Sequence, residues 1–369
     1  MAASGAAGEE PGGAGTASGA GGLVGGGDAG AGGTGVSGGS GQGGASGATD
    51  AVAACILAAQ AKGEVPKVPA VGTPNAFTLG GQTAWYHDEG FAAGYFHTYD
   101  ALDVAKGTTP AHKVNVFLPR GYEADKSKRY PVVYMNDGTT AFFPGGPANK
   151  SWRTADALAI LYQCGAIDEV IVAAVWPVDR NQEYTHAAWQ DGTTCCGVAA
   201  YGDYLAGPLK GFLDAQYRTR PERAFTTIVG SSHGGLAAFH VAATHGATFG
   251  HAVAMSSSFW VGLDFKPSTI GGPLASSALL AATAPTLDDA SLRPRLWLDW
   301  GLVREGGEHN SVTEAFATTR GREMRDLLVA SHGYVVGSTL SWVEDPAGQH
   351  DEDSWARRLP MALRAALAP

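Results

Sequence analysis

The sequence predicts an α/β fold, in which helices cover both faces of a mostly parallel central sheet. Short, continuously apolar runs such as 130–135 and 169–175 have the composition of strands that are buried on both sides. Segments with the apolar spacing of helices, such as 201–217 and 311–331, separate these runs along the chain. Strands that alternate with helices are typical of a parallel sheet, because each crossover needs a helix-length connection.

The individual elements are expected between residues 76 and 369. Aromatic residues gather at 83–97, and this segment is expected to open the fold with antiparallel edge strands. The strands expected after it are 113–119, 130–135, 169–175, 225–229, 252–255, 296–300 and 339–343. The expected helices are 152–163, 201–217, 236–243, 311–331 and 354–368.

Residues 1–50 differ in composition from the rest of the chain. Glycine, alanine and serine dominate this segment, and it contains no lysine, arginine or aromatic residue. Such a segment buries too little apolar surface to offset the entropy lost on ordering. We expect a disordered tail at 1–50, a linker that can form a short helix at 51–75, and one folded domain at 76–369. The tail is either a spacer from a cell surface or a segment without a role.

Composition and charge exclude two classes of partner. The formal net charge is −10 and no run of basic residues occurs, so nucleic acid is not an expected partner. No run of about 18 apolar residues is present, so no membrane span is expected.

The start of the chain lacks the basic and apolar regions of a signal peptide. We nevertheless expect a secreted or surface-tethered protein whose signal has been removed.

The chain has four cysteines, and their spacing does not indicate a zinc site, because no C-x-x-C pair occurs. An even number permits two disulfides in an exported protein. Cys195 and Cys196 are adjacent, so we expect each to pair with a distant cysteine, and Cys55 and Cys164 are the other two. Four free thiols are the alternative.

One stretch, 228–236, combines the end of an apolar strand, a G-x-S-x-G motif and the start of a helix. This context is what a nucleophile elbow requires. Gly230 and Gly234 leave room for the sharp turn that presents the hydroxyl of Ser232 at the top of a sheet. The alternative is a glycine-rich helix start at which Ser231 or Ser232 only caps the helix.

Several motifs in a fixed order give the chain a family resemblance. They are VNVFLPRGY, YPVVYMNDG, DRNQEYT, IVGSSHGGLAAF, FGHAVAMSSSFW, LWLDWG and GQHDEDSWARRLP. Together they span about residues 113–360, and the chain resembles the putative-esterase branch of the α/β-hydrolases. That branch includes esterase D, feruloyl esterases, enterochelin esterases and the antigen 85 mycolyltransferases. The resemblance implies that 76–369 is an α/β-hydrolase catalytic domain.

A catalytic serine needs a base and an acid that orients it. His350 is the candidate base, because it lies in a loop after the last expected strand and the resemblance implies this position. The alternative is a surface histidine. The order of the triad places the acid between residues 233 and 349, and the resemblance implies the loop after LWLDWG. Glu305 is the candidate, with Asp299, Glu308 and more remotely Asp345 as alternatives; it could instead pair with a surface arginine.

An oxyanion hole needs two backbone donors. One candidate is the N–H of His233, which follows the serine, and the resemblance implies Gly138 or Thr139 for the other. The tryptophans that the resemblance implies near the mouth are Trp152, Trp176, Trp189 and Trp260. Each could instead belong to the core, because large aromatic residues dominate core packing.

The expected function is that of a serine carboxylic-ester hydrolase, working through an acyl-enzyme without a metal or organic cofactor. The expected substrate is a small-molecule or polysaccharide-linked ester. One alternative is an acyltransferase of the mycolyl type, which passes the acyl group to a sugar hydroxyl. The other is a non-catalytic protein that binds carbohydrate or another surface partner. Neither the substrate nor the oligomeric state follows from the sequence.

Overall fold

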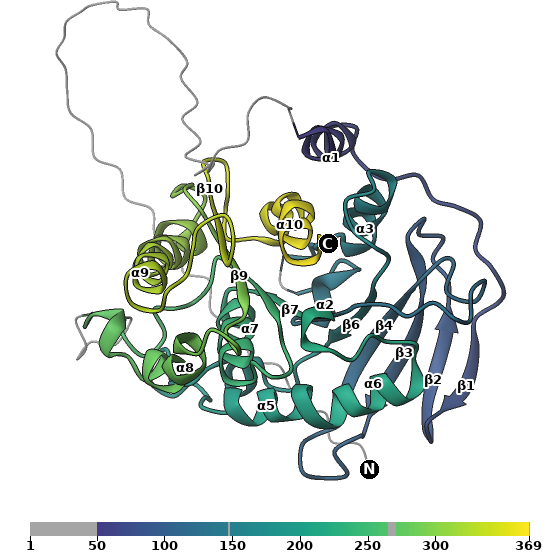
Figure 1. Ribbon diagram of the computed structural model, residues 1–369, viewed down its shortest axis with the longest axis horizontal. Helices are drawn as coiled ribbons and strands as arrows, with labels where there is room; N and C mark the ends of the chain where they lie inside the picture. Colours follow the sequence, from purple (N-terminus) through teal and green to yellow (C-terminus); the bar gives the residue numbers. More distant parts are fainter. Residues whose placement is uncertain (1–49, 147, 265–270, 369) are drawn as a thin grey trace, which may run out of the picture. The chain divides into compact units, whose positions relative to one another are not determined.

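A computed structural model describes residues 50–146, 148–264 and 271–368 of the chain. The expected tail therefore lies outside the described residues, apart from Asp50. The described part contains the expected α/β fold, with a sheet that Figure 1 shows between two layers of helices.

Ten strands form one sheet within the described ranges, in the order β1-β2-β3-β4-β6-β5-β7-β8-β9-β10. The strands β1 to β4 pair antiparallel, as does β4 with β6, and all pairs from β6 to β10 are parallel. Their bounds are β1 Asn75–Leu79, β2 Gln82–His87, β3 Gly94–Leu102, β4 His112–Pro119, β5 Val132–Met135, β6 Ile171–Val175, β7 Thr226–Ser231, β8 His251–Met255, β9 Arg295–Gly301 and β10 Leu340–Asp345.

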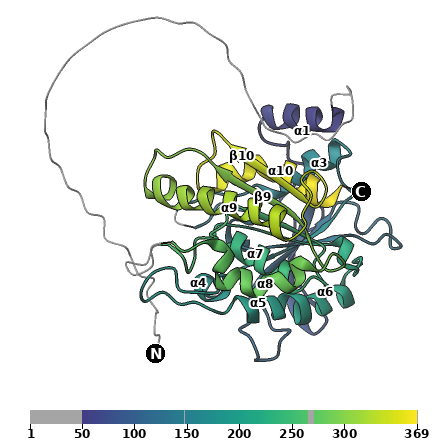
Figure 2. The ribbon, with the colours of Figure 1, turned by 60° about the vertical axis from the view of Figure 1, so that its left-hand side comes forward.

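The two faces of the sheet belong to two cores, because successive side chains of a strand point to opposite sides. In β5, Val132 and Tyr134 pack with the helices α5 to α9, whereas Val133 and Met135 pack with α1, α3 and α10. Figure 2 shows α3 and α10 on one side of the sheet and α5, α7 and α8 on the other. The continuously apolar strands are therefore buried on both faces, as predicted.

The described residues also form the helices α1 to α10 and the short helical turns η1 to η4. They are α1 Ala51–Ala61, α2 Gly138–Ala141, α3 Thr154–Gln163, α4 Arg180–Tyr184, α5 Val198–Tyr204, η1 Leu205–Leu209, α6 Lys210–Gln216, η2 Arg223–Phe225, α7 His233–Thr244, η3 Leu274–Ser276, α8 Ala278–Asp288, η4 His309–Glu314, α9 Ala315–Ser331 and α10 Glu352–Leu367. The helix expected at 201–217 contains the π-helical turn η1, where Pro208 has no N–H to continue the α pattern. The helix α8 was not among the expected elements.

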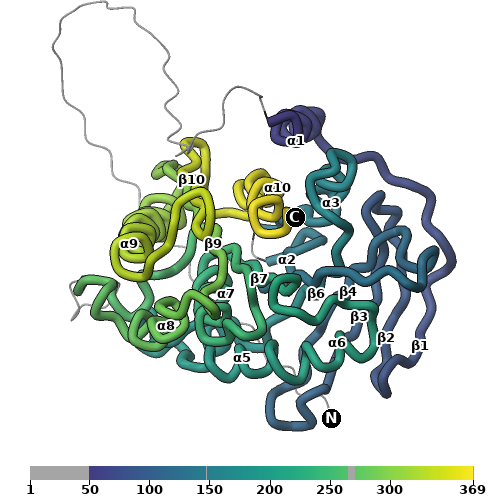
Figure 3. Tube along the Cα trace, viewed as in Figure 1, coloured from purple at the N-terminus to yellow at the C-terminus, as the bar shows by residue number. Residues whose placement is uncertain are grey.

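Helix α1 is attached to the domain by a disulfide and by packing. Cys55 on α1 is bonded to Cys164, which caps α3, with a Cα–Cα distance of 5.8 Å. Ile56 is fully buried between the helices. The tube in Figure 3 shows α1 beside α3 and α10, so segments from the two ends of the described chain lie together.

The expectation that Cys195 and Cys196 each pair with a distant cysteine is wrong. They are bonded to each other, across Cα atoms 3.8 Å apart. Neighbouring side chains of an extended segment point apart, which is why a bond between them was not expected. The backbone turns here instead, with a φ of 79° at Cys196, and the turn brings the two sulfurs together.

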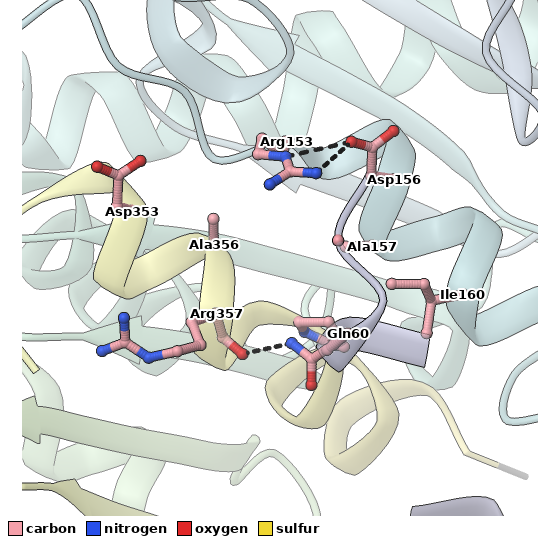
Figure 4. A pocket seen from close by; sticks show the side chains of 10 residues that line it. Gln60, Arg153, Asp156, Ala157, Ile160, Asp353, Ala356 and Arg357 are labelled. Atoms are coloured by element: carbon pink, nitrogen blue, oxygen red, sulfur yellow. Dashed lines mark hydrogen bonds and ion pairs between the residues drawn. The ribbon is translucent and has the colours of Figure 1, made fainter. Parts of the chain in front are cut away.

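A cleft of about 250 Å³ lies where α1 meets α3 and α10 (Figure 4). Its polar contacts are made within the protein. Arg153 donates to Asp156 at 3.1 and 3.2 Å, and the Gln60 amide donates to the Arg357 carbonyl at 2.7 Å. None of the residues predicted to act in a functional site lines this cleft.

Candidate active site

Ser232 lies in a sharp turn between β7 and α7. Its φ of 54° and ψ of −124° are an unusual conformation for a residue with a side chain. A Cβ on Gly230 would lie 2.0 Å from the Gly234 carbonyl oxygen, and a Cβ on Gly234 would lie 2.7 Å from Asp137 Oδ2. The two glycines of the motif therefore allow the strand, the helix and the neighbouring loop to approach closely, as predicted.

The hydroxyl of Ser232 does not cap its helix. Ser232 occupies the N-cap position of α7, but its side chain makes no capping hydrogen bond. Ser232 Oγ lies 2.9 Å from His350 Nε2 instead. This geometry removes the capping alternative for Ser232, because the hydroxyl is used in a contact with an imidazole 118 residues away.

His350 lies between β10 and the start of α10. Its backbone N–H donates to Asn310 Oδ1 at 2.9 Å, and its ring packs edge-on against Trp355 at 5.2 Å between centroids. The first contact fixes the backbone of the loop, and the second holds one side of the ring. Its second nitrogen, Nδ1, lies 2.5 Å from Glu314 Oε2, so the imidazole connects a serine to a carboxylate.

The carboxylate that contacts His350 belongs to Glu314, which corrects the expectation of Glu305. The exposed Glu305 lies in the loop directly after β9, whereas Glu314 is fully buried at the end of η4. Through η4 the chain returns to the end of β9, where Glu314 Oε1 accepts from the backbone N–H of Gly301. The expectation failed because it placed the acid in the first part of this connection.

The alternative acids have other partners or positions. Asp299 is buried in β9 and forms an ion pair with Arg358 at 2.9 Å, as well as accepting from Trp297 Nε1 at 2.8 Å. Asp345 lies 2.9 Å from Arg357 and 3.2 Å from Arg358. Glu308 is exposed at the start of η4. None of these carboxylates has a hydrogen bond to His350 among the described residues.

A polar network surrounds the inner oxygen of Glu314. Glu314 Oε1 accepts from Ser256 Oγ at 2.9 Å and from the backbone N–H of Gly301. Arg358 Nη2 donates to Ser256 Oγ at 3.0 Å and forms the ion pair with Asp299. A buried polar group is costly unless its partners are present, so this network determines where the carboxylate lies.

Burial and charge act against each other in this network. Burial raises the pKa of Asp299, and the nearby Arg358 offsets only part of this effect. Burial alone would lower the pKa of Arg358, but the carboxylates of Asp299 and Glu314 outweigh it and raise that pKa. The guanidinium therefore remains charged beneath the site.

The candidate oxyanion-hole residues lie at the starts of two neighbouring helices. Gly138 and Thr139 begin α2 after β5, and His233 begins α7 after the adjacent strand β7. The first N–H groups of a helix have no acceptor within it and favour negative charge. Asn136 Nδ2 joins the two turns by donating to the Gly234 carbonyl at 2.8 Å.

The ring of His233 makes its own contact beside the serine. His233 Nδ1 lies 3.0 Å from Ser258 Oγ, and Ser258 Oγ is 3.4 Å from Ser232 Oγ. Burial, together with the positive charge of Arg180, holds the pKa of His233 well below its usual range. The ring is therefore neutral at neutral pH.

The tryptophans predicted for a substrate pocket lie in three different surroundings. Trp260 packs against the ring of His233, with centroids 5.5 Å apart, and Trp189 packs against both rings at 5.8 and 6.1 Å. The half-buried Trp176 covers the position of Gly138, where an added Cβ would be 2.5 Å away. Trp152 is buried in the core against Trp355.

The sheet order, the elbow and the histidine loop together define an α/β-hydrolase. The family described as Putative esterase matches residues 107–366, and the chain belongs to this family. The fold and the family predicted from the sequence are thereby confirmed. Among the described helices, none has the length and hydropathy that a membrane span requires.

Solved structures of low sequence identity share this fold. The BES protein from Bacillus cereus is 16% identical, with a TM-score of 0.53 over 83% of this chain and 99% of that one. The siderophore hydrolase EstA from Aspergillus nidulans is 19% identical, with a TM-score of 0.51 over 69% and 90%. An IroE-like serine hydrolase from Shewanella oneidensis is 17% identical, with a TM-score of 0.50 over 72% and 79%. A search of curated proteins returned no match.

A signal for Glu314 was present in the sequence. The buried residues of α9 include Ala317, Gly321, Met324 and Leu328, and Glu314 lies on the same helical face. A carboxylate on the apolar face of a helix is unusual unless it has a buried partner. This pattern points to Glu314. Arg358 has the same signal, because it lies between Trp355 and Ala362 on the buried face of α10, whereas Ser256 has none.

Proposed function

We propose that the protein is a serine carboxylic-ester hydrolase whose catalytic triad is Ser232, His350 and Glu314. The observation that carries this proposal is the continuous contact from Glu314 Oε2 to His350 Nδ1 at 2.5 Å and from His350 Nε2 to Ser232 Oγ at 2.9 Å. A serine hydroxyl becomes a nucleophile when an oriented imidazole takes its proton, and the carboxylate supplies that orientation.

In the proposed reaction, Ser232 Oγ attacks the ester carbonyl while His350 Nε2 accepts its proton. The N–H of His233, with that of Gly138 or Thr139, donates to the oxyanion of the tetrahedral intermediate. His350 then returns the proton to the alcohol, which leaves an acyl-enzyme on Ser232. Water activated by the same imidazole releases the acid and restores the serine. Glu314 stays ionised and stabilises the imidazolium in both halves.

The aromatic side chains beside the serine support an ester with a bulky acyl group. Trp260 and Trp189 pack around His233, next to Ser232, and Trp176 lies at the proposed oxyanion loop. Trp189 and Trp176 keep part of their apolar surface exposed for a substrate, whereas the buried Trp260 supports Trp189 from behind. Trp152, which the sequence also suggested for the pocket, would act only through Trp355 and His350.

We further propose that the protein is exported. The described residues contain two disulfides, Cys55–Cys164 and Cys195–Cys196. Disulfides persist in oxidising surroundings and are reduced in most cytoplasms. Titration of thiols in the unfolded, unreduced protein should find none, and four thiols would contradict the proposal.

A fluorophosphonate probe tests the assignment of the nucleophile. The probe should label Ser232, and Ser232→Ala should abolish both labelling and turnover of 4-nitrophenyl acetate, with a loss of about 10⁶ in kcat. Ser127→Ala, in an exposed loop, is the matched control and should change neither. Labelling at another serine would reject the triad.

Product analysis with added alcohol separates hydrolysis from acyl transfer, since a transferase would give mainly the new ester.

A further inference from the structure

The loop formed by residues 185–197, which we name the Trp189 loop, is closed at its base by backbone contacts. It connects α4 to α5 and has no helix or strand of its own. The N–H of Cys196 donates to the Thr185 carbonyl at 2.9 Å, and the N–H of Gly197 donates to the Gln182 carbonyl at 2.8 Å. Such a loop, with its ends held together, behaves as a compact unit.

Trp189 connects the Trp189 loop to the aromatic residues beside Ser232. The ring of Trp189 meets His233 edge-on at 5.8 Å and 84°, and it meets Trp260 at 6.1 Å and 79°. Its indole Nε1 lies 3.3 Å from Asn181 Oδ1 on α4, which sets the orientation of the ring. His233 and Trp260 are buried, whereas Trp189 keeps part of its surface exposed. Trp189 therefore forms the outer part of the aromatic group next to Ser232.

The disulfide between Cys195 and Cys196 lies at the base of this loop. The bond closes a small ring around one peptide group, so it limits the backbone conformations of both residues. Cys196 has a φ of 79°, in the region that residues with side chains rarely adopt, and its N–H is one of the two closing donors. Without the bond, this residue would gain access to more favourable conformations, and the closing contact would weaken.

We propose that Trp189 determines the acyl specificity of the enzyme, and that the Cys195–Cys196 disulfide holds it in place, so that reduction of this bond relaxes specificity. The inference rests on the proposed esterase function. A dithiol reagent supplies the two electrons and two protons: one S–S bond breaks, two cysteine thiols form, and the reagent closes its own disulfide. Cys196 is exposed and Cys195 is half-buried, so a reagent can reach the bond.

The experiment compares two esters that share a leaving group, 4-nitrophenyl benzoate and 4-nitrophenyl acetate. The benzoate-to-acetate ratio of kcat/KM should fall roughly 3- to 10-fold in Trp189→Ala, the effect of losing an aromatic contact, and Trp189→Phe should restore part of it. Trp85→Ala is the matched control, because Trp85 is exposed on β2, which β3, β4, β6 and β5 separate from β7 in the sheet, and its ratio should equal that of the wild type. An unchanged ratio in Trp189→Ala would overturn the role of Trp189.

The effect of reducing the disulfide is measured on the same benzoate-to-acetate ratio of kcat/KM. A dithiol should lower the ratio in the wild type and in Cys55→Ser/Cys164→Ser, which keeps only the loop disulfide. The double variant Cys195→Ser/Cys196→Ser should show the low ratio already and should not respond to the reagent. The role of the loop disulfide would be overturned if the dithiol still lowered the ratio in Cys195→Ser/Cys196→Ser. It would also be overturned if the dithiol had no effect on the ratio in Cys55→Ser/Cys164→Ser. A wild type that neither turns over 4-nitrophenyl acetate nor reacts with fluorophosphonate would instead reject the proposed function.

Discussion

Glu314 Oε2 lies 2.5 Å from His350 Nδ1, and the two side chains come from segments that meet over the ends of β9 and β10. Glu314 ends a π-helical turn, while His350 follows the last strand. The other oxygen of Glu314 accepts from Ser256 and Gly301, so the carboxylate cannot rotate away without losing these bonds. The buried hydrogen bonds of Oε1 therefore hold Oε2 in contact with His350.

Replacement of the acid should affect the rate far more than the fold. Glu314→Gln keeps the shape of the side chain but removes the charge that stabilises an imidazolium, so kcat should fall by about 10⁴-fold, as in other triads. Steady-state kinetics with 4-nitrophenyl acetate measure this loss. Glu305→Ala is the matched control and should keep the wild-type kcat. If Glu305→Ala lost activity while Glu314→Gln kept it, the assignment of the acid would be reversed.

Arg358 should stabilise the protein through its buried ion pair. Arg358→Ala leaves the carboxylate of Asp299 buried without its partner, which typically costs about 3–5 kcal/mol of unfolding free energy. Urea denaturation measures this change. The neighbouring Arg357 is about half exposed, so Arg357→Ala should cost no more than about 1 kcal/mol. Equal losses of unfolding free energy in the two variants would show that the buried pair of Arg358 and Asp299 stabilises the protein no more than an exposed pair does.

The elbow should not tolerate a side chain at Gly230. An added Cβ would lie 2.0 Å from a backbone oxygen, so Gly230→Ala should lower the free energy of unfolding by about 1–3 kcal/mol or more and reduce fluorophosphonate labelling. Gly211 on α6 has no atom within 4 Å of its added Cβ, and there alanine should be neutral or stabilise by about 0.5–1 kcal/mol. Thermal unfolding of both variants tests the pair. A Gly230→Ala protein with native stability and labelling would contradict the packing argument.

Buried histidines should make the fold less stable in mild acid. Burial lowers the pKa of His240 to about 4, and His186 and His251 have the same shift from the same cause. In the unfolded chain a histidine titrates near 6.5, so between these values the unfolded state binds more protons. Stability should therefore be full above about pH 6.5 and fall as the pH decreases toward 4.

Urea midpoints measured from neutral pH down to about pH 5 check this slope. His240→Phe removes one of the groups that must stay neutral in the folded state, so its midpoint should depend less on pH than that of the wild type. A wild-type midpoint that is constant or rises toward lower pH would rule out the explanation.

Much of the fold could be predicted because its signals are local. The apolar strands and the helices between them indicated the parallel sheet, and the strand, G-x-S-x-G and helix of 225–243 indicated the elbow. Helix α8 was missed, and the turn at Pro208 interrupted an expected helix. The loop position of His350 came from the family resemblance, and the structure places it against Ser232.

The sequence by itself determined the sheet and the elbow serine, because both depend on neighbouring residues and on strand order, and its family resemblance added the loop of the histidine. Only the tertiary structure decided which carboxylate meets His350 and which cysteines are bonded. Glu305 and Glu314 both follow the same strand, and the path of the chain through η4 selects between them. Likewise, the left-handed turn at Cys196 overrides the usual divergence of neighbouring side chains. Both outcomes depend on how the connecting loops fold back on the domain. The apolar face of α9 indicates that Glu314 is buried, but no local pattern specifies that His350 is its partner or that the two adjacent cysteines are bonded.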